Sequence, residues 1–387
     1  MALYIAQTPA SASLAQSPII FSISESVTSV ISNTAFQYVA DLYYWTGSMT
    51  QSSSVSEYTM VKFPNVSLYG IFDLNRIINS TLTDLAQVNT SNVMYFACDF
   101  FTQYTSGSTF VTGSHLKSDT YKALDGYGIF QEEIGQPIYT SSVFWPLMTD
   151  GPATQSAFTV NKGVTGVYVG SVGTTQPNRL KYTSATQTAF ITLSGSVSSS
   201  QQIQTYPIGP AESGFPLSGS FTSYKIQAQN STTDLGKAIT YNIVCEQKYP
   251  NVRIKWKNRF GQFDWFNFNM VSRQSFNTER RTYQPQLGTW GASTLSYQPY
   301  NSSTLNYISD SKQALSVQTD WVSQDYNEIF KQLLVTDEAY WIYDEANGDI
   351  RPITISTDSI TFKTGVNDKV IQYGFDFNFG QAYKLII

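Results

Sequence analysis

The chain has 387 residues, enough for two or three domains, which excludes a disulfide-stapled miniprotein. Charged residues make up only 13% of the chain, about half the usual share, whereas aromatic residues make up 15%, which excludes a disordered chain. The formal net charge of -5 gives no electrostatic reason to expect nucleic acid as a partner.

The first ten residues have no basic region and no sustained apolar core, so they do not resemble a secretory signal. No stretch reaches the roughly 20 apolar residues of a membrane-spanning helix. We therefore expect synthesis in the cytoplasm of the producing cell and no membrane span.

Residues 1–140 combine strand and helix patterns. Phe36, Tyr38, Ala40, Leu42 and Tyr44 alternate with other residues, which predicts a strand with one buried face. Apolar residues at three- and four-residue spacing then predict a helix over about 73–88, with Asp73 as its cap. This region is predicted to be an N-terminal β-sandwich with one helix.

Residues 141–235 are rich in Ser, Thr and Gly and contain turn signals such as Asp150-Gly151-Pro152. Short strand-like runs lie between these turns. The pattern favours a second β domain or a large insertion.

Residues 236–387 form the third predicted region, a C-terminal β domain. Alternation in 239–245 and in 252–256 predicts a hairpin around a turn at 249–251. Asp325 and Glu328 resemble a capping box at the start of a short helix over about 325–335. The whole chain is therefore predicted to be mainly β, with two or three β-sandwich or β-barrel-like domains and one or two short helices.

Residues with catalytic potential are sparse. The only histidine, His115, lies in a polar loop-like run, and no Gly-x-Ser-x-Gly turn offers a nucleophile. Cys98 and Cys245 lie in apolar runs typical of reduced core cysteines. The acidic pairs that could serve a glycosidase lie beside turns or helix ends, where solvated charges are common: Glu132-Glu133, Asp337-Glu338 and Asp344-Glu345. We expect no enzyme, no catalytic residue, no metal site and no cofactor.

The tryptophans could form sugar-stacking platforms or could be core residues. Core is the favoured interpretation for those in strand-like runs: Trp256, Trp265, Trp290, Trp321 and Trp341.

Residues 255–283 form a basic-aromatic segment that is unusual in a chain so poor in charge. Such residues either pair internally or meet an acidic partner. The favoured alternative is an internal ion-pair network of Asp264, Glu279, Arg280 and Arg281, and the other is a partner-binding patch.

The same segment resembles virion structural proteins of tailed phages that infect Bacteroidota, including the crAss-like phages. The resemblance rests on Trp256-Lys-Asn-Arg-Phe-Gly-Gln-Phe-Asp-Trp-Phe-Asn-Phe268, then on Arg273 and Glu279-Arg280-Arg281-x-Tyr283. Further similar elements lie at both ends of the chain, and residues 140–235 are unmatched. Where related segments show two adjacent glycines, this chain has Gly261-Gln262.

The resemblance implies a subunit located in the virion, in a ring of the neck or tail below the portal. Its partners would be copies of itself in a cyclic ring and other virion proteins. The expected core of the segment consists of Trp256, Phe263, Asp264, Trp265 and Phe266. The expected interface residues are Arg273, Glu279, Arg280, Arg281 and Tyr283, with Leu385, Ile386 and Ile387 of the apolar C-terminal tail.

Two other functions stay open: a carbohydrate-binding or carbohydrate-degrading β protein, such as an adhesin or tail fibre, and a capsid or decoration subunit. The tail at 383–387 is expected to join a sheet of its own chain or to be donated to a neighbour.

Overall fold

The computed structural model describes residues 3–10, 12–46, 51, 56–88, 93–128, 147, 149–158, 165–170, 178–192, 202–244, 249–288, 298–344, 349–364, 371–380 and 383–386. The chain is mainly β with several sheets and few helices, which confirms the predicted fold class. It divides into two compact units: residues 1–245 with 257–264 form unit 1, and residues 246–256 with 265–387 form unit 2. No helix in the described ranges is long and apolar enough to cross a membrane.

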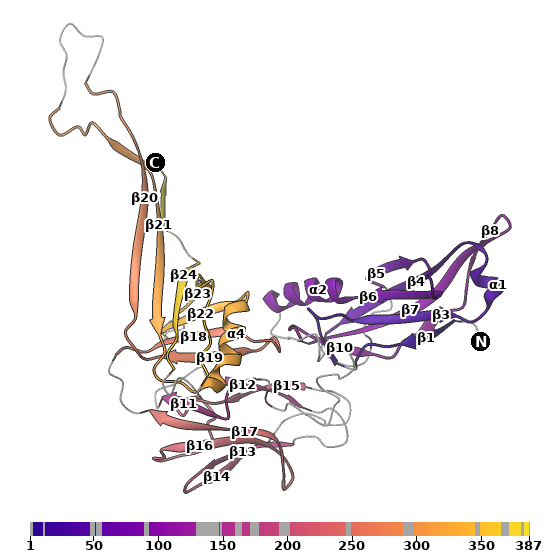
Figure 1. Cartoon of the computed structure of the whole chain (residues 1–387), viewed down its shortest axis with the longest axis horizontal. Helices are drawn as coiled ribbons and strands as arrows, with labels where there is room; N and C mark the ends of the chain where they lie inside the picture. Colours follow the sequence, from indigo (N-terminus) through magenta and orange to yellow (C-terminus); the bar gives the residue numbers. More distant parts are fainter. Residues whose placement is uncertain are drawn as a thin grey trace. The chain divides into compact units, whose positions relative to one another are not determined.

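The N-terminal part of unit 1 contains two sheets, drawn in indigo and purple in Figure 1. The first is three-stranded, with the order β1 (Leu3–Gln7), β3 (Ile20–Glu25), β6 (Tyr69–Asp73). The second has the order β2 (Ala12–Leu14), β10 (Tyr121–Leu124), β7 (Val93–Ser106), β4 (Thr34–Trp45), β5 (Tyr58–Lys62), while β8 (Thr109–Thr112) and β9 (Leu116–Lys117) pair with β7.

One hydrophobic core joins these two sheets. The alternating residues of β4 from Phe36 to Leu42 are buried in it, as predicted, and they share it with Phe21 of β3 and Phe72 of β6. Burial of each such side chain contributes roughly 1.5–3 kcal/mol. The predicted N-terminal sandwich follows from this alternation.

Helix α2 (Asn75–Val88) covers the predicted helical range, and the helix begins two residues later than expected. Leu74, Ile78 and Leu82 are fully buried in the sandwich core. Asp73 Oδ1 accepts hydrogen bonds from the backbone N–H groups of Asn75 and Ile19, at 3.1 and 3.2 Å. Asp73 thus ties the start of the helix to the chain before β3. A single helical turn, α1 (Thr28–Ile31), follows β3.

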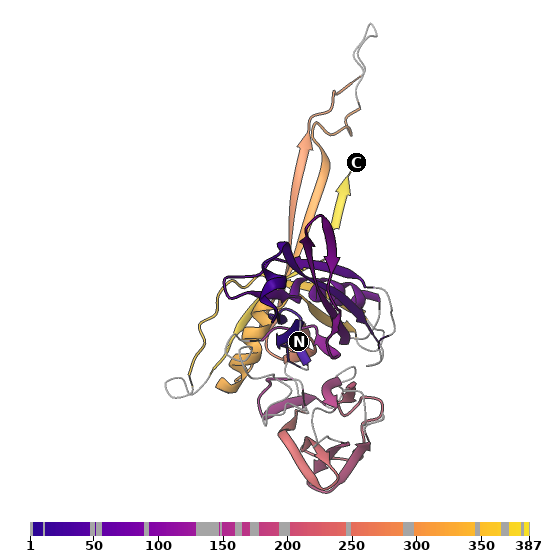
Figure 2. The same cartoon turned by 90° about the vertical axis from the view of Figure 1, so that its right-hand side faces the viewer.

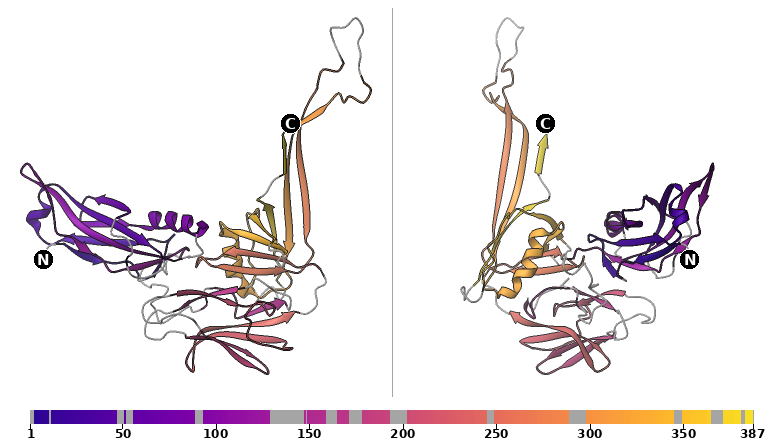
Figure 3. Two further views of the ribbon diagram at one scale, coloured as in Figure 1. Left: turned by 180° about the vertical axis from the view of Figure 1, so that it is seen from behind. Right: turned by 45° about the vertical axis from the view of Figure 1, so that its right-hand side comes forward.

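The middle part of unit 1 contains a five-stranded and a two-stranded sheet. The larger has the order β11 (Thr154–Phe158), β17 (Thr233–Val244), β16 (Ser223–Asn230), β13 (Arg179–Ser184), β14 (Thr188–Thr192). The smaller pairs β12 (Thr165–Gly170) with β15 (Gln202–Pro207). Figure 3 shows the long β16 and β17 lying side by side.

The predicted hairpin between residues 239–245 and 252–256 is wrong. β17 pairs with β16 and β11, whereas the later strand pairs with β22 in another sheet. Alternation predicts a strand but does not identify the strand it pairs with. A tight turn at Ser231, whose φ is 50°, connects β16 to β17 and brings the two strands together as a pair. The predicted domain boundary after residue 235 consequently falls inside β17.

Unit 2 is built on one eight-stranded sheet, and the tip of its first hairpin belongs to unit 1. Seven strands follow the order β19 (Phe263–Phe268), β18 (Val252–Lys257), β22 (Ala339–Asp344), β23 (Asp349–Ile355), β24 (Gly374–Phe379), β21 (Leu305–Gln318), β20 (Arg273–Tyr283). The eighth, β25 (Tyr383–Ile386), pairs with β21.

Helix α4 (Asn327–Val335) occupies the range predicted for the second helix and follows a 3₁₀ turn, η1 (Gln324–Tyr326). Ile329, Phe330 and Leu333 pack into the core of unit 2. The predicted capping box does not form, because the 3₁₀ turn places Asp325 before the helix and no side chain caps it.

Candidate assembly interface

The five interface residues predicted in the basic-aromatic segment all lie on one strand. Arg273, Glu279, Arg280, Arg281 and Tyr283 are exposed residues of β20. The strand is 11 residues long. Ten of its residues are exposed, and Thr278 is partly buried. β20 ends the strand order of its sheet, so its outer side pairs with no described strand.

β20, β21 and β25 together form a three-stranded ribbon that we call the arm. β20 pairs with β21 from Arg273 opposite Ser316 to Tyr283 opposite Leu305. On the other side of β21, β24 pairs with 314–318 and β25 with 308–311. Figure 2 shows the outer half of the arm as an isolated ribbon beyond the other strands of unit 2.

The outer arm exposes large apolar side chains. Phe276 is 56% exposed and Tyr283 47% exposed. Tyr307, on β21, packs edge-on against Tyr283 with ring centroids 6.2 Å apart. A ribbon of this kind has no core of its own, and aromatic residues with arginine are enriched where proteins bind each other.

The charged side chains of β20 are exposed to solvent. Arg273, Glu279, Arg280 and Arg281 form no ion pair with any residue in the described part of the chain. Glu279 lies directly opposite Asp310, a like-charge neighbour. The predicted internal network is therefore not formed, and Asp264 bonds instead to Asn258 within unit 1.

The C-terminal tail pairs with its own chain. Leu385 lies opposite Ser309, and Ile386 lies opposite Ile308, both on β21. Of the two expected alternatives, the structure contains the one in which the tail joins a sheet of its own chain. Ile387 lies outside the described residues.

The expected core residues divide into two groups. Trp256 is fully buried, whereas Phe263, Asp264, Trp265 and Phe266 keep partial exposure, because β19 is an edge strand rather than a strand covered on both faces. Phe266 still packs edge-on against Phe330, at 5.2 Å between ring centroids. Among the other tryptophans, Trp341 is buried, Trp321 is 62% exposed against expectation, and Trp290 lies outside the described residues.

Residues 257–264, which we call the clasp, fold into unit 1 through buried ion pairs. The Arg259 guanidinium donates two hydrogen bonds to the carboxylate of Asp150, one of them from Nη2 to Oδ1 at 3.0 Å. Lys257 Nζ lies 2.7 Å from Asp125 Oδ2. All four side chains are nearly buried, and the partners come from far away in the sequence. Sequence patterns gave no sign of these partners.

The backbone of the clasp is fixed by Asn258 and Gly261. Asn258 Oδ1 accepts hydrogen bonds from the backbone N–H groups of Phe260 and Gln262, both at 3.0 Å. Gly261 has φ +71°, and a Cβ there would lie 1.2 Å from the carbonyl oxygen of Asp125. Only glycine fits this close approach. Gln262 is accommodated beside it as a buried residue.

Asp264, the last residue of the clasp, has a raised pKa. Burial of its carboxyl group raises the pKa to about 7, although hydrogen bonds from Thr149 and Asn258 oppose the shift. The nearby negative charge of Asp150 raises the pKa further. Protonated Asp264 is therefore present at mildly acidic pH.

The residues with catalytic potential lie elsewhere in unit 1. His115 Nδ1 is 3.0 Å from Asp99 Oδ2, and its ring packs on Phe101 at 4.5 Å between centroids. Burial raises the pKa of the Cys98 thiol far above its usual value. Among the described residues, no three His, Cys, Asp or Glu side chains are grouped to hold a metal ion. Glu132-Glu133, Cys245 and Glu345 lie outside the described residues.

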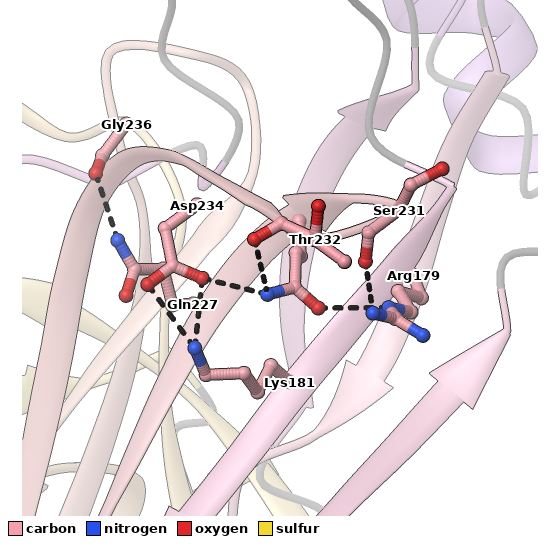
Figure 4. A network of polar contacts seen from close by, with 8 residues as sticks. Arg179, Lys181, Gln227, Ser231, Thr232, Asp234 and Gly236 are labelled. Atoms are coloured by element: carbon pink, nitrogen blue, oxygen red, sulfur yellow. Dashed lines mark hydrogen bonds and ion pairs between the residues drawn. The ribbon is translucent and has the colours of Figure 1, made fainter.

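A polar network on the middle sheet was also missed by sequence reasoning. Lys181 Nζ bonds both carboxylate oxygens of Asp234, at 2.8 and 3.1 Å, and Gln229 links Asp234 to Arg179. Figure 4 shows these side chains converging from neighbouring strands. The side chains of Lys181 and Asp234 are partly exposed, at 23% and 40%. The polar groups of the network form hydrogen bonds with one another, so we assign it a structural role.

Comparison with protein-family models finds no match, and comparison with curated proteins finds no significant similarity. Inference about function therefore rests on the residues and on the geometry of the clasp and the arm.

Proposed function

We propose that the protein is a structural subunit of a tailed-phage virion, a ring protein of the neck or tail below the portal. It would be made in the cytoplasm of the host bacterium and would act in the particle, by packing against copies of itself and against other virion proteins. The resemblance of residues 256–283 to phage virion proteins supports this proposal, and a mainly β chain poor in charge suits it.

The observation that carries the proposal is the arm. Two- or three-stranded ribbons are marginally stable in water on their own, yet this one exposes Phe276, Tyr283 and Tyr307. Exposed apolar patches of this kind mark interaction sites. A neighbouring subunit would remove these rings from water and supply partners for Arg280 and Arg281.

The mode of action would be association rather than catalysis. Interfaces are anchored by aromatic residues and arginine, with other charges depleted at their centres. The arm carries the aromatic residues and arginines, in Phe276, Tyr283, Tyr307, Arg280 and Arg281. In a cyclic ring, the arm of each subunit would bind a different surface of the next subunit, which is a heterologous contact.

Electron-microscope class averaging of the concentrated native protein tests the proposal. Closed rings with one dominant symmetry are expected. The variant Phe276→Ser/Tyr283→Ser should lose the rings while keeping the circular dichroism spectrum of the native protein. The matched control is Phe110→Ser, because Phe110 is 60% exposed on β8, outside the arm.

Deletion of residues 383–387 gives a second test. The shortened chain should fold but should not enter particles, because the arm loses its third strand. Normal incorporation would contradict the assembly role of the tail.

The test also separates the alternatives. A uniform monomer that binds or hydrolyses glycans on an array would favour the carbohydrate function. Location on the capsid surface, seen by labelling of particles, would favour a decoration subunit.

A further inference from the structure

The outer side of β20 is a long strand edge that pairs with no strand in the described part of the chain. An edge strand presents backbone N–H and C=O groups that can pair with a strand of another chain. Natural proteins usually shorten or cover such edges. β20 is 11 residues long and exposed along its length.

The sequence of β20 is suited to pairing with itself. In an antiparallel pair related by a two-fold axis, full overlap of the strand places Thr278 opposite Thr278 of the second copy. Phe276 then lies opposite Arg280 of the second copy, and Arg273 lies opposite Tyr283. Each of these combinations occurs twice, and each is a cation–π pair.

The neighbouring registers are disfavoured by charge. Moving the centre to Asn277 puts Arg273 opposite Arg281 of the second copy, twice. Moving it to Glu279 puts the two Glu279 side chains opposite each other. Directly opposed like charges destabilise a strand pair, so both of these registers are disfavoured relative to the one centred on Thr278, which opposes no like charges.

We propose that β20 binds β20 of a second copy of this chain, as an antiparallel pair centred on Thr278. This two-fold contact uses the same patch on both copies and differs from the heterologous contacts that would close a ring. It goes beyond the proposed function, because it names a partner for the strand edge of β20 and does not need the ring. Either contact can fail while the other holds.

Disulfide trapping tests the register. Thr278→Cys should form a covalent dimer under mild oxidation, because opposed residues of an antiparallel pair have Cβ atoms close enough to bridge. The matched control is Thr282→Cys on the same strand, which would lie opposite Gln274 of the second copy and should stay monomeric. Both variants retain the native cysteines, so any background is shared.

Charge substitution at Asn277 tests the same register without cross-linking. Asn277 would lie opposite Glu279 of the second copy, so Asn277→Lys should tighten the dimer and Asn277→Glu should weaken it, each by on the order of tenfold in Kd. Within one chain Asn277 lies opposite Lys312, so the effect on hairpin stability has the reverse sign. Analytical ultracentrifugation measures the dimer and thermal unfolding measures the hairpin.

Equal cross-linking of the two cysteine variants would overturn the register, and a wild-type protein that stays monomeric at every concentration would overturn the contact. Rings without Thr278→Cys cross-links would leave the proposed function intact and refute this pairing. Cross-linked dimers without rings would support this pairing and count against the ring.

Discussion

The clasp and strand β20 of the arm come from one continuous stretch of similar composition, yet they use their charges in opposite ways. In the clasp, Lys257 and Arg259 are buried and each is paired with an aspartate. In the arm, Arg280 and Arg281 are exposed on an edge strand. Burial beside an acidic partner, and not the residue type alone, therefore decides what a basic residue does.

The comparison also separates two kinds of energetic role. Removing one member of a buried ion pair leaves an uncompensated charge, which is strongly destabilising. Exposed charges contribute little to folding. The clasp should govern stability and the arm should govern assembly.

Arg259→Ala should have the largest effect on stability. It leaves the Asp150 carboxylate buried without its guanidinium, which should lower the free energy of unfolding by about 3–5 kcal/mol. Calorimetry of the isolated variant measures the loss. A change below about 1 kcal/mol would contradict a buried, paired role for Arg259.

Asp264 should make stability depend on pH. Its pKa is about 7 in the folded chain and 3.8 in an unperturbed one, so the folded state binds the extra proton between these values. Stability from this group should therefore fall as pH rises from about 4 to 7, by roughly 3 kcal/mol after allowance for partial exposure.

The variant Asp264→Asn isolates this contribution, because the difference between its pH profile and that of the wild type contains only the one titration. Asp358→Asn, at an exposed position, is the matched control. Parallel profiles for wild type and Asp264→Asn would show that the clasp does not retain the proton.

Lys181→Ala should give an intermediate to small loss. Its ion pair with Asp234 is half-exposed, so the expected decrease is about 1 kcal/mol or less. Added salt should weaken the wild type more than the variant, which urea unfolding at two ionic strengths would measure.

Arg281→Ala should change stability least, by less than about 0.5 kcal/mol, because the residue is exposed on β20. Sedimentation of the same sample should nevertheless show reduced assembly. Native stability combined with native assembly would remove Arg281 from the interface.

Local sequence patterns predicted the helices and strands whose formation depends on the spacing of their own apolar residues. The alternation from Phe36 to Leu42 and the spacing of Leu74, Ile78 and Leu82 identify a strand and a helix without reference to the rest of the chain. The partner of β17 was not predictable in this way, because pairing depends on turns and on competing strands.

The candidate site was predictable only in part. The residue types of β20 marked it as unusual, but its exposure follows from its place at the end of the sheet. Arg259 and Asp150 are 109 positions apart, so no local pattern links them. The raised pKa of Asp264 depends on burial, which a single sequence does not display.

The strand order of unit 2 has a consequence for biosynthesis. The hairpin of β20 and β21 leaves the ribosome before β22, β23 and β24, yet it joins their sheet only through β24. Until residues 374–379 have been translated, the hairpin cannot pair with the other strands of its sheet. Chains that terminate before this point would carry a hairpin whose backbone is not joined to the sheet.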